Sequence, residues 1–154
     1  MKDVLISINK PHTDNIFSGD KSVEWRRKPL PEGRYCVYET KNKGGCGMVI
    51  GEMRITGSKA VDTSGPLEVC LVNAGCVHPV TLKKYASNGT VYANFIQDAK
   101  RYDVPQPLSY YVKCPYPWDC GACDQYDGIE MVCKRKHRPP QSWCYIGEVA
   151  YESR

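Results

Sequence analysis

Three residues in the stretch SGDKSVEWRR, at positions 18–27, could do chemistry together: Lys21, Glu24 and Arg26. A lysine beside a carboxylate can hold a phosphate while the carboxylate takes up a proton or contacts a base edge. A guanidinium makes bidentate contacts with a phosphate or a base, and strand alternation places Arg26, not Arg27, beside Glu24. We therefore predict that all three residues bind a ligand, with Lys21 and Glu24 as the candidate catalytic residues.

Two local features must position these side chains. Gly19 is suited to end a short preceding helix, because glycine adopts the left-handed C′ conformation without steric strain. After it, Val23 and Trp25 alternate with polar residues, as in a strand with one buried face. The alternative is a solvated strand edge, in which Glu24 and Arg26 form a surface ion pair of little energetic consequence.

The cysteines form a second constellation. Nine cysteines is a high and odd count, which argues for buried thiols or metal ligands in a reducing compartment and against a disulfide framework. Cys120 and Cys123 form one chelating pair, and Cys133 and His137 form another, within a Cys-rich insertion at about residues 114–138. Such pairs suit tetrahedral zinc, so we predict that these four residues could hold a structural zinc ion. A loop with free thiols is the alternative.

The same part of the chain carries its densest positive run, KRKHR at residues 134–138. Cations with aromatic neighbours suit single-stranded RNA or a nucleotide, because they combine phosphate neutralisation with stacking. A solvated charged loop explains the run equally well. The aromatic residues that precede it are Tyr110, Tyr111, Tyr116, Trp118 and Tyr126.

Composition limits the class of protein. The 154 residues, 42% hydrophobic and 25% charged, suffice for one core, so we treat residues 1–154 as a single domain. The formal net charge of +4 is compatible with a polyanionic partner but does not require one. No apolar run approaches the roughly 20 residues of a membrane span. The first residues, MKDV, lead into a strand and not into a signal peptide, so we expect a cytoplasmic protein without membrane attachment.

Strands outnumber helices in the hydrophobic pattern. Stretches rich in β-branched and aromatic residues predict strands of one curved sheet at residues 4–8, 34–40, 48–55 and 90–99. Short turns separate these strands. We therefore predict an α+β, mainly β fold, a small barrel-like core with short flanking helices.

The remaining segments are expected to be helical or irregular. A short helix is expected after Pro11, because proline suits the first turn. Further short helices are expected at residues 67–74 and 81–86, and irregular chain at residues 58–66 and 104–108. Residues 142–151 return to strand-like composition and are expected to complete the sheet.

The order of several motifs resembles the ASCH family of PUA-like domains. A strand running into KP is followed by a short helix, SGDKSVEWRR, a Tyr-rich strand, VIGE at residues 49–52, and a late PPQSW at residues 139–143. The resemblance covers about residues 1–110 and 138–150. It implies a PUA-like β-barrel with an RNA- or nucleotide-related ligand in a cleft, where Ser142 would complete the wall beside Lys21, Glu24 and Arg26.

The same resemblance leaves the activity open. Some relatives look like ribonucleases, and others are amidohydrolases that act on acylated cytidine and pair the matching lysine with a threonine nucleophile. This chain keeps Lys21 but has Glu24 at the nucleophile position. We therefore predict a protein that binds RNA or a nucleotide-like small molecule. A hydrolase of RNA or modified nucleosides and a zinc-stabilised protein-interaction module are the alternatives.

Overall fold

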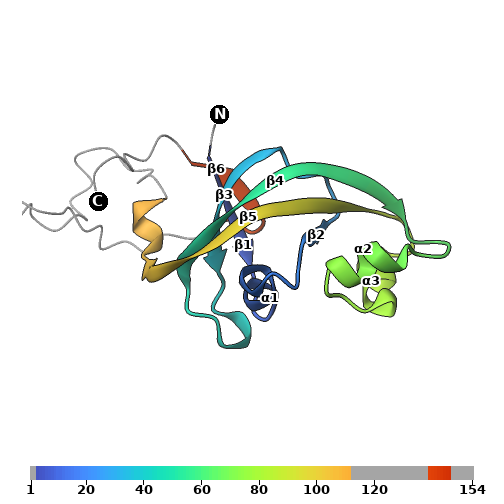
Figure 1. The fold of residues 1–154 in the computed structure, drawn as a ribbon, viewed down its shortest axis with the longest axis horizontal. Helices are drawn as coiled ribbons and strands as arrows, with labels where there is room; N and C mark the ends of the chain where they lie inside the picture. Colours follow the sequence, from blue (N-terminus) through green and yellow to red (C-terminus); the bar gives the residue numbers. More distant parts are fainter. Residues whose placement is uncertain (1–2, 112–138, 147–154) are drawn as a thin grey trace, which may run out of the picture.

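The computed structural model describes residues 3–111 and 139–146 of the chain. Within these ranges the strands form one six-stranded mixed sheet in the order β2-β5-β4-β3-β1-β6, flanked by short helices (Figure 1). The predicted α+β, mainly β architecture is confirmed. The elements are β1 (Val4–Ile8), α1 (His12–Ser18), β2 (Val23–Arg26), β3 (Gly33–Glu39), η1 (Asn42–Gly44), β4 (Met48–Asp62), α2 (Val69–Ala74), α3 (Pro79–Tyr85), β5 (Thr90–Gln106), η2 (Leu108–Tyr110) and β6 (Trp143–Tyr145).

Strand β1 lies between two hydrophobic clusters. Its sequence VLISI is buried along its whole length because both faces of the strand pack against apolar side chains. Val4, Ile6 and Ile8 belong to one cluster, and Leu5 belongs to the cluster on the other face. β1 pairs in parallel with β3 and antiparallel with β6, as expected for a C-terminal strand that completes the sheet.

Helix α1 packs on the first of these clusters. Ile16 is buried there and Phe17 packs against it. Gly19 ends the helix with a φ of 89°, the left-handed conformation predicted from the sequence. A Cβ at Gly51, in the VIGE motif of β4, would lie 2.6 Å from the Phe17 ring, so this glycine is what lets the helix approach the sheet.

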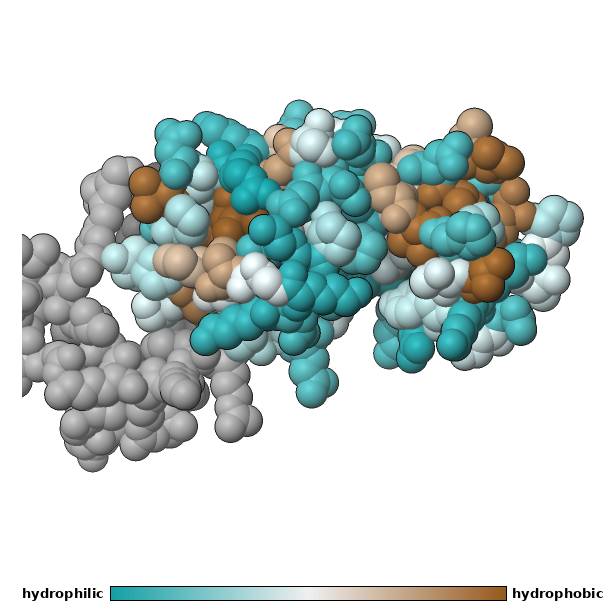
Figure 2. Space-filling view, turned by 90° about the horizontal axis from the view of Figure 1, so that it is seen from below, coloured by the Kyte–Doolittle hydropathy of each residue, from teal (hydrophilic) through white to brown (hydrophobic). Residues whose placement is uncertain are grey.

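Strands β4 and β5 form a long curved ribbon that ends near α2 and α3 (Figure 1). A third hydrophobic cluster lies at this end of the ribbon. It includes Val23 and Trp25 of β2 and Val72 of α2. Apolar side chains are gathered over this end of the molecule (Figure 2). Bulges between the paired residues of β4 and β5 interrupt their register. Such bulges bend and twist a sheet.

Two predicted irregular segments belong to this ribbon. Residues 58–62 are part of β4 and residues 104–106 are part of β5, so the predicted loops at 58–66 and 104–108 are wrong over those positions. The reason is that β4 and β5 satisfy each other's backbone groups, and mostly exposed side chains can then be small and polar without ending the strand.

Among the described residues, no helix has the length and apolar character needed to cross a membrane.

Candidate functional site

A cavity of about 800 Å³ opens where α1, β2, the β3–β4 connection, α3 and residues 139–141 meet. This volume is within the range of about 300–1,000 Å³ that small-molecule and cofactor sites occupy. Its walls mix polar, charged and aromatic side chains. The polar, charged and aromatic lining residues are Ser7, Asn9, His12, Lys21, Glu24, Trp25, Arg26, Tyr38, Thr40, Lys41, Asn42, Thr81, Tyr85 and Gln141.

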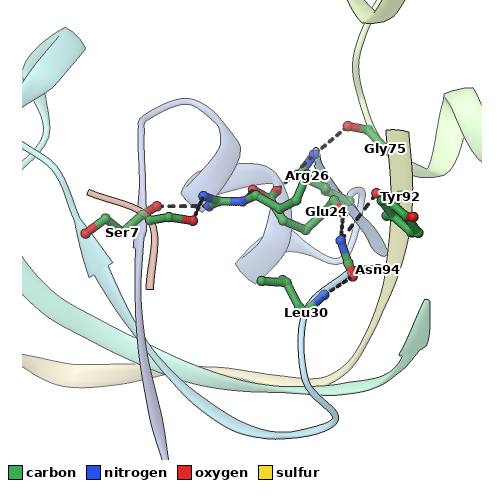
Figure 3. A network of polar contacts seen from close by, with 9 residues as sticks. Ser7, Glu24, Arg26, Leu30, Gly75, Tyr92 and Asn94 are labelled. Atoms are coloured by element: carbon green, nitrogen blue, oxygen red, sulfur yellow. Dashed lines mark hydrogen bonds and ion pairs between the residues drawn. The ribbon is translucent and has the colours of Figure 1, made fainter. Parts of the chain in front are cut away.

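Arg26 joins the two edges of the sheet. It lies on β2, one edge strand, whereas β6 is the other edge strand. Its guanidinium donates from Nη2 to the carbonyl of Ser7 in β1 at 3.0 Å, and from Nη1 to the hydroxyl of Ser142 at 3.1 Å (Figure 3). The sheet is therefore curved far enough for one side chain to bridge its ends, and the cavity lies beside this bridge.

Glu24 and Lys21 extend the contacts of Arg26 into the interior. Arg26 Nε donates to Glu24 Oε1 at 3.0 Å, and Lys21 Nζ lies 3.5 Å from Glu24 Oε2. The side chains of Lys21 and Glu24 are only 1% and 9% exposed. We call Lys21, Glu24 and Arg26 the seam cluster. Two cations share one carboxylate in this cluster, so each buried charge has a counter-charge, as burial in a low-dielectric interior requires.

Lys21 also holds the C-terminal end of helix α2. Its ammonium donates to the carbonyl of Gly75 at 2.6 Å, and the amide of Ser22 donates to the carbonyl of Ala74 at 2.9 Å. The last carbonyls of a helix have no partner within the helix, and a lysine suits them. A Cβ at Gly75 would overlap the Trp25 indole, so glycine is required at this contact.

Asn94 of β5 fixes the backbone beneath Glu24. Its side-chain amide donates to the carbonyl of Glu24 at 2.9 Å, while its oxygen accepts the amide of Leu30 at 2.8 Å (Figure 3). Asn94 is fully buried and satisfied on both sides. Such a network holds the backbone of β2 at Glu24 in one place, next to the cavity that Glu24 lines.

His12, the first residue of α1, lies at the same cavity. Its Nδ1 is buried and has no hydrogen-bond partner within the described part of the chain. Burial, followed by the charge of Lys21, lowers the pKa of His12 below its ordinary value of 6.5; Lys43 and Arg26 act in the same direction and Glu24 opposes them. The imidazole is therefore neutral at pH 7, and a neutral imidazole can both donate and accept a hydrogen bond.

The residues predicted to bind a ligand come together, but their side chains are already engaged. Lys21, Glu24 and Arg26 line the cavity, and Ser142 accepts a hydrogen bond from Arg26 beside it. The prediction from the sequence was that the charges of Lys21 and Arg26 bind a ligand directly. In the structure both cations bind Glu24 and backbone carbonyls.

The cavity lining also includes His12, Lys41 and Tyr85, which were not predicted from the sequence to belong to the site. Only His12 had a local indication, because it directly follows the strand and the KP motif. Lys41 and Tyr85 come from a glycine-rich connection and from the end of α3, and nothing local points to a shared site.

The predicted zinc ligands Cys120, Cys123, Cys133 and His137 lie outside the described residues, as does most of the basic and aromatic stretch. Within residues 3–111 and 139–146, no group of three or more His, Cys, Asp or Glu side chains could hold a metal ion. Zinc binding by the insertion stays a prediction.

No protein-family model and no curated protein sequence matches the chain. Solved structures do match. The ASCH protein from Zymomonas mobilis is 22% identical, with a TM-score of 0.65 over 96% of this chain and 89% of that protein. A serine-to-alanine and a tyrosine-to-phenylalanine variant of the same protein match at 21% identity with the same TM-score of 0.65, covering 96% of this chain and 89% and 92% of theirs. The chain therefore has the fold of the ASCH domain, as the order of its sequence motifs predicted.

Proposed function

We propose that the chain binds single-stranded RNA or a nucleotide in the cavity beside the seam cluster. The observation that carries this proposal is the combination of aromatic walls, buried hydrogen-bonding groups and excess positive charge in one hollow of suitable volume. A nucleotide needs all three, because its base stacks, its base edge forms hydrogen bonds and its phosphate is an anion.

The charges at the cavity favour an anionic ligand. Among the described lining residues, Glu24 is the only carboxylate, whereas Lys21, Arg26 and Lys41 are cations. Lys21 and Arg26 share the Glu24 carboxylate, and Lys41 adds a third cation. The net charge of the described wall is therefore positive. A concave surface with such an excess attracts anions and raises their local concentration.

Aromatic side chains offer surfaces for a base. Trp25, Tyr38 and Tyr85 line the cavity, and the Arg27 guanidinium lies 4.9 Å from the centre of the Tyr85 ring. Tyr85 is 38% exposed, so one part of its ring is accessible from solvent. Stacking of a base on such a ring is worth about 1–3 kcal/mol.

Tyr85→Ala tests the proposal because Tyr85 lies outside the seam cluster. Short single-stranded RNAs and the ribonucleoside monophosphates are titrated against the protein and the variant. We expect the affinity to fall about tenfold or more, in line with the loss of one stacking contact. Tyr145→Ala is the control, since Tyr145 is 53% exposed and does not line the cavity.

Equal affinities of the two variants would place binding elsewhere on the protein. Absence of binding to any RNA or nucleotide by the unaltered protein would reject the function itself. Salt dependence adds a second measure, because binding through phosphates weakens as the salt concentration rises.

A hydrolase of RNA or modified nucleosides is the second candidate, favoured by one observation. The neutral imidazole of His12 lies in the same cavity as the Lys21–Glu24 pair, and an uncharged imidazole can serve as a general base. Glu24 is less suited to that role, since both its oxygens face cations.

Product analysis with short RNAs and acylated cytidine distinguishes the two functions. His12→Gln should abolish turnover and leave binding nearly intact if the protein is a hydrolase. Unchanged turnover in this variant would exclude His12 as the base. Binding without any product, for the unaltered protein, would establish the binder.

A further inference from the structure

The connection between β3 and β4, residues 41–47 with the sequence KNKGGCG, lies at the rim of the cavity. Lys41 and Asn42 line the cavity and are exposed, so they belong to its opening and not to its floor. Lys43 is also exposed and lies two residues further along the same connection. Lys41 therefore stands at the opening with a second solvent-accessible lysine close to it in the chain, in addition to the buried seam cluster.

The seam cluster is poorly placed to bind a phosphate. Lys21 is almost fully buried and donates to the carbonyl of Gly75, and Glu24 lies 3.5 Å from its ammonium. A phosphate that approached Lys21 would also approach this carboxylate, and the two anions would repel each other. Arg26 in turn uses Nε, Nη1 and Nη2 for Glu24, Ser142 and Ser7.

The rim connection is held in place by Glu39. Its buried carboxylate accepts the amide of Cys46 at 2.9 Å and the hydroxyl of Thr13 in α1 at 2.6 Å. Burial opposes ionisation of Glu39, but the hydrogen bonds from Thr13 and Cys46 outweigh it and lower its pKa. The charged carboxylate thus ties the connection to the helix that carries His12.

A glycine directs the Lys41 side chain. A Cβ at Gly47 would lie 2.7 Å from Lys41 Cε and 2.8 Å from its Cγ, so the lysine stem runs directly over this residue. Gly47 also has a φ of 68°, which favours glycine. The Lys41 stem therefore follows a defined course over Gly47, and the residue stays exposed to solvent.

We propose that the rim connection, residues 41–47, is the phosphate-binding element of the site, with Lys41 and Lys43 as the phosphate ligands. The base then enters the cavity, between the Tyr38 and Tyr85 walls, and the phosphate stays at the opening. This inference rests on the proposed function. It takes as ligand a mononucleotide, or one unstacked nucleotide of an RNA, whose base lies in the cavity and whose phosphate stays at the opening.

The test compares each ribonucleoside with its 5′-monophosphate by calorimetric titration at low salt. The unaltered protein should bind the monophosphate more tightly. Lys41→Gln combined with Lys43→Gln should reduce the monophosphate affinity about tenfold, since two exposed charge contacts are lost, and leave the nucleoside affinity unchanged. Lys59→Gln is the control, because Lys59 is an exposed lysine that pairs with Glu68 and does not line the cavity.

A second arm uses a short single-stranded RNA, which separates an RNA phosphate from a free nucleotide. The double variant should lower the slope of log affinity against log salt by about 1–2, as expected for two lost phosphate contacts. Equal melting temperatures of the variants verify that the fold is kept. If the double variant retains the full advantage of the monophosphate and the full salt slope, the inference is wrong and the nucleotide site stands. If the unaltered protein binds no nucleoside, nucleotide or RNA, the proposed function and the inference both fall.

Discussion

Two clusters of three charged residues lie at different depths in this protein. The seam cluster pairs Glu24 with both Arg26 and Lys21, and the side chains of these three residues are only 9%, 16% and 1% exposed. A second cluster, the open cluster, pairs Arg34 with Glu52 at 2.5 Å and with Asp3 at 3.3 Å, and its side chains are 39%, 29% and 35% exposed. The Arg34–Glu52 pair, at 2.5 Å, is shorter than the Arg26–Glu24 pair, at 3.0 Å, so a short contact does not by itself distinguish the seam cluster.

The difference lies in what surrounds the charges. In the seam cluster, Lys21 also donates to the carbonyl of Gly75, and Arg26 also donates to the carbonyl of Ser7; both carbonyls are far away in the sequence. Solvent reaches the open cluster and screens it, so that such pairs contribute little to stability. A buried cluster cannot lose one member without leaving another charge uncompensated. We therefore expect the same substitution to have very different consequences in the two places.

The largest effect is expected from Glu24→Gln. The substitution leaves Lys21 and Arg26 buried without their counter-charge, which should lower the free energy of unfolding by about 3–5 kcal/mol. Urea denaturation followed by circular dichroism measures the change. A loss below about 1 kcal/mol would mean that the seam cluster is solvated like the open cluster, and the comparison would fail.

Arg26→Lys should have the next largest effect. An ammonium cannot reach Glu24, Ser7 and Ser142 together, so we expect a loss of about 1–3 kcal/mol and faster hydrogen exchange of the Ser7 amide, which donates to the carbonyl of Ser142. Arg27→Lys is the control, because Arg27 follows directly in the chain and, within residues 3–111 and 139–146, makes a single hydrogen bond, at 3.3 Å to the Tyr85 carbonyl. Equal losses for both variants would argue against a bridge across the sheet edges.

His12 makes a smaller, pH-dependent contribution. Because its pKa is lowered in the fold, the unfolded chain binds more protons below the ordinary value of 6.5. Its contribution to stability is therefore complete above that pH and is lost as the pH falls through the lowered pKa. His12→Gln should flatten the decline of melting temperature between about pH 7 and pH 5.

Glu39 does not obscure that measurement. Its lowered pKa places the corresponding loss below its ordinary value of 4.5, in a more acidic range. An unchanged decline in His12→Gln between about pH 7 and pH 5 would assign the acid sensitivity to another group.

The smallest effect is expected from Glu52→Gln in the open cluster. Arg34 keeps its contact with Asp3 at 3.3 Å and stays accessible to water, so we expect a change of at most about 1 kcal/mol in the free energy of unfolding. The same denaturation experiment as for Glu24→Gln gives a direct comparison. A loss as large as that of Glu24→Gln would show that burial does not govern these clusters.

Much of the fold was predictable from local patterns. The VLISI run of β1, the helix end at Gly19 and the shared face of Val23 and Trp25 each depend on residues a few positions apart. The polar part of β4 was missed, because the strand there is sustained by pairing with β5 and not by its own composition.

The candidate site was only partly predictable. Lys21, Glu24 and Arg26 lie at one cavity, since a strand and a turn bring near neighbours to one wall. Their hydrogen-bond partners could not be predicted from the sequence. Lys21 donates to a carbonyl 54 positions away, and Arg26 to a hydroxyl 116 positions away.

The sequence by itself determined most of the strands and helices, and the order of motifs that identifies the fold. These depend on hydrophobic periodicity and on backbone preferences, which act over a few residues. The tertiary structure decided which cations are free to meet a ligand. Curvature of the sheet buries Lys21 against α2 and draws Arg26 across the sheet edges, whereas Lys41 stays at the cavity opening. Burial and distant partners govern the availability of a charge, and both arise only when the chain is folded.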